Sequence, residues 1–286
     1  MLKQFKTGQW HYYPKLPSHV QQMYMVIYKG ILQKQTLINV PVLKHNGVFP
    51  TTQYLTNVMM MVVWDNPELY YFSAANVRTN FWQGYSQSNF QIVYTDYYSD
   101  HEEEQILKTL LMRADFILQE TAGMTDYAKY RYIHDYLVRT VKYMYDIQKT
   151  NIQPTLEAST VVGPLLNNLG VCSGIAKTFK LLCDQAGLSC FYVQGDANGI
   201  WGWDLHGWNV VCLEGKYYHV DVTWDISQFH HNGIVSNQYF LRSDQFMAQS
   251  RKWDRSLFPA MQEDYPRSTA KLGSKVKSFL EKLFCD

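Results

Sequence analysis

The sequence lacks an excess of charge of either sign, and it lacks long apolar runs. Its 286 residues include 26 lysines and arginines against 25 aspartates and glutamates, which leaves a formal net charge of +1. Proteins that hold nucleic acid or an anionic membrane surface by electrostatic attraction carry a basic excess. No apolar run approaches the ~20 residues that a bilayer span requires. The sequence therefore predicts neither a nucleic-acid partner nor a membrane-spanning segment.

Signals for secretion and for a cysteine-based scaffold are also missing. Residues 1–15 contain no apolar core of a signal peptide, so we expect a cytoplasmic protein. A secreted or surface-exposed location stays open if a leader precedes this sequence. The odd number of cysteines, without CxxC spacing, predicts neither a disulfide framework nor a structural zinc site, although five thiols also allow one nucleophile and two bridges. The cysteines are Cys172, Cys183, Cys190, Cys212 and Cys285.

The composition is that of an ordered globular protein, with 47% hydrophobic and 15% aromatic residues. Apolar periodicity and turn residues predict a mixture of helices and short strands. The expected helices are 24–32, 54–64, 102–118, 130–141 and 172–186; the expected strands are 69–72, 90–94 and 190–193; the expected loops are 151–160 and 196–203.

Cys172 begins the best-defined of these helices, within the segment Gly170-Val-Cys-Ser-Gly174. A helix N-terminus carries partial positive charge and unpaired N–H groups, which favour a thiolate over a thiol and can hold an oxyanion. The other cysteines fall on apolar faces or near the C-terminus, where a small packed side chain explains them. Cys172 is therefore the candidate nucleophile.

A β-hairpin is expected downstream of this helix. Its strands, 207–213 and 216–224, flank the two-residue turn Glu214-Gly215, which pairs Leu213 with Lys216.

This register predicts which side chains meet. His206 lies opposite Thr223 and Trp208 lies opposite Asp221. Because side chains along a strand alternate between the two faces, His206 and Asp221 become diagonal neighbours on one face, within reach of a hydrogen bond. A slip of one residue would separate them.

The three candidates have complementary roles. Cys172 attacks a carbonyl carbon, His206 takes and returns the proton, and Asp221 fixes the tautomer of the ring and stabilises the imidazolium. Other residues compete for the last two roles. The alternative bases are His134, expected on a helix, and His219, which adjoins the candidate acid too closely; the alternative acids are Asp204 and Asp225.

The motifs around these residues resemble the transglutaminase-like superfamily, whose members share a papain-like cysteine-protease core. The matching motifs, in order, are GVCSGIA (170–176), HGWN (206–209) and YYHVDVTWD (217–225). Flanking segments extend the resemblance to about residues 50 to 265. Gly207 departs from the pattern, since the family usually has a larger residue there, commonly alanine, and we expect this change to leave the base undisturbed.

The resemblance implies an α+β fold in which the Cys172 helix packs on an antiparallel sheet that carries His206 and Asp221. It also implies an acyl-enzyme mechanism without an organic cofactor, and the calcium sites of animal relatives have no matching motif here. A fourth group usually completes the oxyanion hole in such enzymes, and the candidates are Asn167, Asn168 and a nearby aromatic residue.

The expected organisation has three parts, which are a mixed α/β extension (1–98), a catalytic core (99–266) and a C-terminal amphipathic helix (267–286). The expected activity is that of a cysteine peptidase or amide hydrolase with a protein or peptide substrate. Two alternatives stay open, a protein-glutamine cross-linking transglutaminase and a non-catalytic binding module of the same fold. The oligomeric state does not follow from the sequence.

Overall fold

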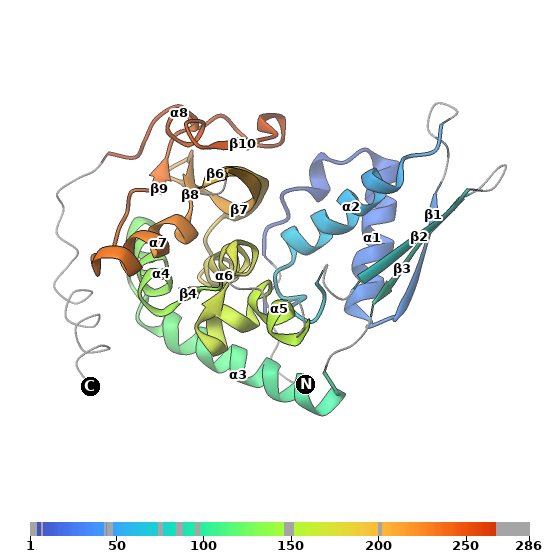
Figure 1. The fold of residues 1–286 in the computed structure, drawn as a ribbon, viewed down its shortest axis with the longest axis horizontal. Coiled ribbons are helices and arrows are strands. Elements are labelled where there is room, and N and C mark those ends of the chain that lie inside the picture. Colours follow the sequence, from blue (N-terminus) through green and yellow to red (C-terminus); the bar gives the residue numbers. More distant parts are fainter. Residues whose placement is uncertain are drawn as a thin grey trace.

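The computed structural model describes residues 5–6, 8–42, 44, 48–73, 77–83, 88–94, 98–145, 152–199 and 202–266. The C-terminal segment 267–286, for which the sequence predicts an amphipathic helix, lies outside these residues. Within them, the chain forms an N-terminal part (residues 5–94) and a second part (residues 98–266) that pack side by side (Figure 1).

The N-terminal part is a small antiparallel sheet covered by two helices. Its elements are the 3-10 helix η1 (Tyr13–Lys15), α1 (Ser18–Leu32), β1 (Leu37–Val42), α2 (Thr52–Asp65), β2 (Val77–Gln83) and β3 (Ser88–Tyr94). The strand order is β1-β3-β2, with both pairs antiparallel. Alternate side chains of β1 and β3 are buried, and they share one apolar cluster with the inner faces of α1 and α2, as a one-sided sheet requires.

The second part is built around a five-stranded antiparallel sheet. Its elements are α3 (Asp100–Gln119), α4 (Asp126–Thr140), β4 (Lys142–Tyr143), α5 (Ile152–Ala158), the π-helix η3 (Gly163–Asn167), β5 (Leu169–Gly170), α6 (Cys172–Gln185), β6 (Cys190–Gly199), β7 (Gly202–Leu213), β8 (Lys216–Val220), α7 (Val222–Asn232), β9 (Phe240–Arg242), α8 (Asp244–Met247), β10 (Arg251–Trp253) and the 3-10 helix η4 (Arg255–Leu257). The strand order is β10-β6-β7-β8-β9. The α+β fold, with the Cys172 helix on an antiparallel sheet, is confirmed.

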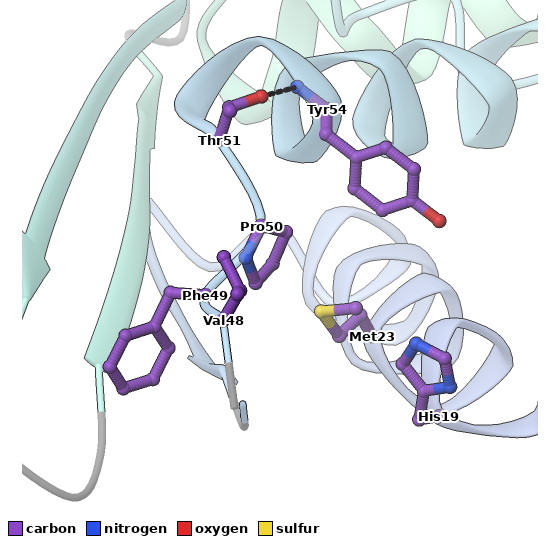
Figure 2. Close-up of a pocket in the computed structure, with 7 residues that line it drawn as sticks. All are labelled: His19, Met23, Val48, Phe49, Pro50, Thr51 and Tyr54. Atoms are coloured by element: carbon purple, nitrogen blue, oxygen red, sulfur yellow. Dashed lines mark hydrogen bonds between the residues drawn. The ribbon is translucent and has the colours of Figure 1, made fainter. Parts of the chain in front are cut away.

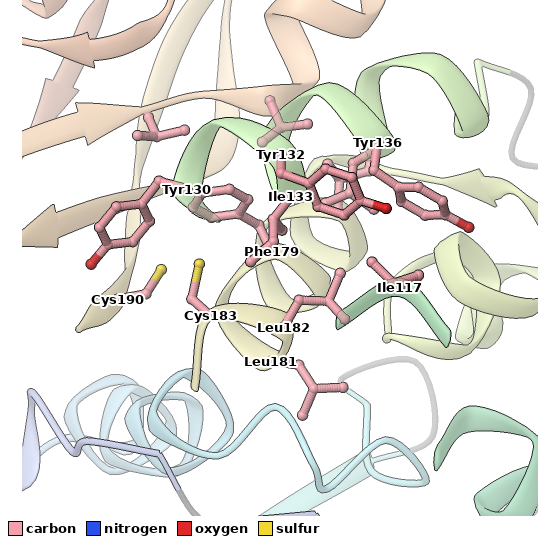
Figure 3. Close-up of a cluster of buried hydrophobic side chains, with 14 of the residues drawn as sticks. Ile117, Tyr130, Tyr132, Ile133, Tyr136, Phe179, Leu181, Leu182, Cys183 and Cys190 are labelled. Atoms are coloured by element: carbon pink, nitrogen blue, oxygen red, sulfur yellow. The ribbon is translucent and has the colours of Figure 1, made fainter. Parts of the chain in front are cut away.

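Helix α6 lies at the centre of this part, between the sheet and the other helices (Figure 1). Figure 3 shows its apolar residues Phe179 and Leu182 packed toward Ile133 of α4, and all three are fully buried. The helix ends as the sequence predicts, because Gly187 adopts a left-handed φ of 76° that favours glycine. Burial on nearly all sides fixes the direction of α6, and with it the position of Cys172 at its start.

The N-terminal part contacts the second part through a short segment before α1. The Tyr12 hydroxyl donates a hydrogen bond to the carbonyl oxygen of Tyr192 in β6 at 2.8 Å. The Asp65 carboxylate holds that segment in place by accepting hydrogen bonds from the backbone N–H groups of His11, Tyr12 and Tyr13. The Trp64 ring of α2 stacks on the Tyr192 ring, with centroids 5.6 Å apart. The N-terminal part thus supports a strand that leads into the candidate site.

Three local predictions are wrong, each because tertiary contacts decide the conformation. Residues 69–72 form turns, not a strand, and their aromatic side chains pack without strand pairing. The expected loop 151–160 contains α5, whose Leu156 is buried against the second part. The expected loop 196–203 is mostly strand, because β6 and β7 stay paired as far as Gly199 and Gly202.

The hairpin prediction is right for the turn and wrong for the end of the second strand. Glu214 and Gly215 both adopt positive φ, and Leu213 pairs with Lys216, as expected for a two-residue turn. However, β8 ends at Val220 and the chain turns directly into α7. The predicted pairs of His206 with Thr223 and of Trp208 with Asp221 therefore do not form.

Candidate active site

Cys172 is the first residue of α6, where the sequence predicts it. Val171 occupies the N-cap and, being apolar, leaves the N–H groups of the first turn to other acceptors. The thiol is partly exposed, whereas Cys183 and Cys190 are fully buried. The following Gly174 is needed for packing, because a Cβ there would lie 2.1 Å from the carbonyl oxygen of Ala158. Close contact with the end of α5 thus sets the position of this helix start.

His206 and Asp221 meet despite the early end of β8. Asp221 is the N-cap of α7, and its Oδ1 accepts a hydrogen bond from the backbone N–H of Trp224 at 3.3 Å. Its Oδ2 lies 2.8 Å from Nε2 of His206. Because Nε2 is engaged by the carboxylate, Nδ1 is the ring nitrogen left for the hydrogen bond to Cys172. A helix cap, and not a strand pair, therefore brings the carboxylate to the ring.

A buried arginine, which our sequence analysis did not identify, completes the surroundings of Asp221. Arg251 of β10 donates to Asp221 Oδ2 from Nε at 2.9 Å and from Nη2 at 2.5 Å. Both residues are almost fully buried. Arg251 lies thirty residues beyond Asp221 in an ordinary polar segment, and no local pattern marks it. Only the pairing of β10 with β6 brings it to the site.

Gly207 contributes a backbone N–H that lowers the pKa of Cys172 by hydrogen bonding to its sulfur. Among the described residues, β8 pairs with β7 only from Asn209 onward, so this amide is not used in a strand ladder on that side. A Cβ at Gly207 would lie 2.2 Å from the hydroxyl oxygen of Tyr192. Glycine here is therefore matched to Tyr192, in place of the larger residue that is usual in the family.

Substitution of Gly207 by alanine is expected to destabilise the fold by about 1–3 kcal/mol, because the added methyl group overlaps Tyr192. Urea denaturation measures this loss. The double variant Gly207→Ala/Tyr192→Phe removes the overlapping hydroxyl oxygen and is expected to recover part of the stability. An alanine variant as stable as the parent would contradict this steric account.

The charges of the three candidates depend on one another. Burial raises the pKa of the Cys172 thiol. The hydrogen bond and charge of His206, together with the Gly207 N–H, outweigh burial and hold this pKa below its usual range. Burial lowers the pKa of His206, yet the charge and hydrogen bond of Asp221 outweigh it and raise the pKa to about 9. Burial raises the pKa of Asp221, and His206 and Arg251 together hold it well below the usual range. This combination favours a thiolate beside an imidazolium.

Tyr143 is the aromatic residue beside the thiol. Strands β4 and β5 pair in parallel, with Tyr143 opposite Gly170, two residues before Cys172. The backbone N–H of Cys172 hydrogen-bonds to the Tyr143 hydroxyl, which tends to lower the pKa of Tyr143, although burial dominates and raises it. Asn167, one of the asparagine candidates for the oxyanion hole, donates a hydrogen bond from its side-chain amide to Glu157 at 2.7 Å.

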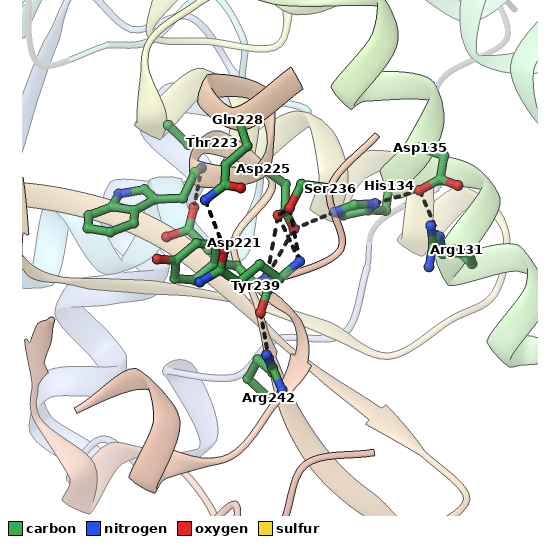
Figure 4. A network of polar contacts seen from close by, with 12 residues as sticks. Arg131, His134, Asp135, Asp221, Thr223, Asp225, Gln228, Ser236, Tyr239 and Arg242 are labelled. Carbon is green, nitrogen blue, oxygen red and sulfur yellow. Dashed lines mark hydrogen bonds and ion pairs between the residues drawn. The ribbon is translucent and has the colours of Figure 1, made fainter. Parts of the chain in front are cut away.

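The alternative bases and acids belong to other interactions. His219 is fully buried between Trp208 Nε1 and Asp244 Oδ1, each at 3.0 Å. His134 lies in a second network, between Asp135 and Asp225 (Figure 4). Asp204 is exposed, and its Oδ1 accepts the backbone N–H of Leu205. None of these four residues is bonded to Cys172 or His206 in the described structure.

A separate apolar pocket lies in the N-terminal part (Figure 2). Its volume is about 370 Å³, and it is lined by His19, Met23, Val48, Phe49, Pro50, Thr51 and Tyr54. None of the three candidate residues lines it. Across the described ranges, no helix combines the length and apolar character that crossing a bilayer requires. Over the same ranges, no cluster of three or more histidine, cysteine or acidic side chains is arranged to hold a metal ion.

Comparisons with known proteins match part of the chain to one family. The family model described as the transglutaminase-like superfamily matches residues 117–222. The kyphoscoliosis peptidases of Homo sapiens and Mus musculus are each 37% identical over a 62-residue alignment, and the match covers 18% of this chain and 9% of the peptidase. The chain thus matches only a small fraction of the length of these relatives.

Solved structures with partial similarity include a proposed cysteine protease from Cytophaga hutchinsonii, at 15% identity and a TM-score of 0.33, covering 51% of this chain and 62% of that one. A TGase structure is 13% identical, with a TM-score of 0.37, covering 67% of this chain and 52% of that one. The part of the chain that matches the transglutaminase-like superfamily, residues 117–222, contains Cys172, His206 and Asp221.

Proposed function

We propose that this protein is a thiol-dependent acyl-transfer enzyme that acts on peptide or amide carbonyls as a cysteine peptidase or amide hydrolase. The observation that carries the proposal is the grouping of the Cys172 thiol, whose pKa His206 lowers, with the His206 ring and the buried Asp221 carboxylate 2.8 Å from it. A thiol, an imidazole and a carboxylate in this order supply a nucleophile, a proton carrier and a group that orients the carrier.

The chemistry follows from these positions. The Cys172 thiolate attacks the carbonyl carbon, and the oxyanion that forms accepts hydrogen bonds from the Cys172 N–H and the Tyr143 hydroxyl. The His206 imidazolium donates its proton to the leaving amine, and a thioester remains on Cys172. Water then attacks the thioester while His206 accepts a proton from it, which releases the carboxylic acid and restores the thiolate–imidazolium pair.

Hydrolysis is the preferred outcome, because the matched stretches of the curated relatives belong to proteins named peptidases. A lysine amine in place of water would give a cross-link through the same thioester. Mass spectrometry of products from a peptide library, with and without an added amine, separates the two. An amide product would favour the transglutaminase, whereas a free acid in both incubations supports the hydrolase.

The first test is the reactivity of Cys172 toward iodoacetamide at mildly acidic pH. We expect Cys172 to be alkylated faster than Cys212, which is also partly exposed. His206→Ala is expected to abolish the advantage, because burial alone raises the thiol pKa. Equal labelling of the two cysteines would instead support a non-catalytic binding module.

The pH dependence of amide turnover has a predicted sign at both ends. The rate is expected to rise as the Cys172 thiol, whose pKa is lowered, loses its proton. It is expected to fall as pH rises through the His206 pKa of about 9, because a neutral ring cannot protonate the leaving amine. A bell-shaped profile of kcat/KM checks this, and activity that keeps increasing well above pH 9 would argue against the assigned proton donor.

A further inference from the structure

Arg251 occupies an unusual environment for a cation, next to the candidate acid. The residue is 1% exposed. Its guanidinium carbon lies 4.1 Å from the ring centroid of Trp224 and 4.5 Å from that of Tyr239, two rings that also contact each other edge to face. The two rings shield the buried cation from solvent, and two of its nitrogens donate to Asp221.

All of these hydrogen bonds converge on one oxygen. Asp221 Oδ2 receives Nε and Nη2 of Arg251 and also faces Nε2 of His206 at 2.8 Å. Asp221 Oδ1 is separately occupied by the N–H of Trp224. The carboxylate is therefore held at both oxygens and cannot rotate without breaking the α7 cap. Its negative charge is shared between two cationic partners.

We propose that Arg251 is a positioning residue for acyl transfer, which locks the Asp221 carboxylate toward His206 and withdraws part of its negative charge from the ring. This inference rests on the proposed function. His206 must both accept and release a proton in each cycle. A buried carboxylate with no other partner would bind the imidazolium proton too firmly for the ring to act as a base. Arg251 weakens that attraction and keeps the geometry fixed.

Other titratable groups surround this cluster from each neighbouring element. Cys172 of α6 faces His206, and His219 of β8 and Tyr239 lie within the field of Arg251. Burial lowers the pKa of His219 and raises that of Tyr239, so both are neutral near physiological pH. Asp225 acts on Tyr239 but is engaged by His134. Arg251 is thus the cation that competes with His206 for Asp221 among the described residues.

The test compares Arg251→Met with Arg242→Met. Arg242 of β9 is also a buried arginine, but its carboxylate partner is Asp264 and its guanidinium lies over the Phe246 ring. The readout is the pH profile of kcat for p-nitrophenyl acetate, whose activated leaving group makes hydrolysis of the thioester, with His206 as base, the slow step. Near-UV circular dichroism checks the fold of each variant.

In Arg251→Met we expect the acid limb of the kcat profile to move to higher pH by about one unit. At a pH on that limb, kcat is then about tenfold lower than in the parent. The Arg242→Met profile is expected to match the parent. If Arg251→Met does not fold, Arg251→Lys carries the test, because it keeps the charge but donates through one nitrogen; a smaller upward shift is expected.

An unshifted limb in a folded Arg251 variant, or an equal shift in Arg242→Met, would overturn the inference and leave the proposed function intact. The proposed function would fail in a different way, if hydrolysis of p-nitrophenyl acetate by the parent protein did not depend on Cys172.

Discussion

Replacement of Asp221 by asparagine is expected to lower amide turnover by about 10³- to 10⁴-fold, the scale of losses when the orienting acid of a nucleophile–histidine–acid triad is neutralised. The amide cannot stabilise the imidazolium, and an NH₂ group facing His206 favours the wrong tautomer of the ring. The substitution would also leave the buried guanidinium of Arg251 without its counter-ion. Initial rates with the best peptide from a library screen measure the effect.

The matched control for this variant is Asp204→Asn. Asp204 is the alternative carboxylate on β7, but it is exposed and bonds only the neighbouring backbone in the described structure. Its replacement is expected to change turnover by less than about threefold, as is usual for exposed positions. A large loss at Asp204 with little loss at Asp221 would reassign the acid.

Replacement of His134 by leucine is expected to lower the free energy of unfolding by about 3–5 kcal/mol, because it breaks a fully buried ionic network. His134 Nδ1 lies 2.8 Å from Asp135 and Nε2 lies 3.0 Å from Asp225, so one ring joins α4 to α7 (Figure 4). Without the ring, two buried carboxylates lose a shared partner. Asp225 also accepts the backbone N–H of Tyr239, so the loss spreads to the segment before β9.

The same network predicts a direction of pH dependence. Burial lowers the pKa of His134, but the hydrogen bonds and charges of Asp135 and Asp225 outweigh it and raise the pKa above the unfolded value. The stabilisation is therefore complete below the ordinary histidine pKa and is lost as pH rises through the higher folded pKa.

Urea denaturation across this pH range, with His230→Ala as control, measures both effects. Nε2 of His230 lies 3.2 Å from the backbone carbonyl oxygen of Val141, and this side chain is expected to contribute little. A His134→Leu protein whose stability and pH dependence equal those of the parent would show that ion pairing of His134 does not stabilise the fold.

Local sequence patterns were sufficient for the elements that end in clear signals. Helix α6 has an apolar face, a glycine-flanked start and Gly187 at its end, and each has a local physical cause. The turn at Glu214-Gly215 sets the register of β7 and β8 for the same reason. The order of the thiol, imidazole and carboxylate motifs indicated Cys172, His206 and Asp221 as the candidate residues. Their catalytic roles stay a prediction.

The features that the sequence did not predict depend on contacts between distant segments. Asp221 looks like a strand residue, because Tyr217 to Thr223 alternate as a strand does, yet its side chain caps a helix. Arg251 and Tyr143 reach the site only through the β10–β6 and β4–β5 pairings. The overlap that Gly207 avoids with Tyr192 also involves two strands. Single-sequence patterns carry no information on such pairings.

The most direct test is to trap the acyl group on the enzyme. Brief incubation with p-nitrophenyl acetate at mildly acidic pH, where hydrolysis of a thioester is slow, is followed by quenching and peptide mapping by mass spectrometry. We expect one acetyl group on Cys172 of the parent and its removal on return to neutral pH, whereas His206→Ala is expected to show no selective acetylation of Cys172. Acetyl groups spread over several cysteines, or an unmodified Cys172, would contradict the assignment of this thiol as the nucleophile.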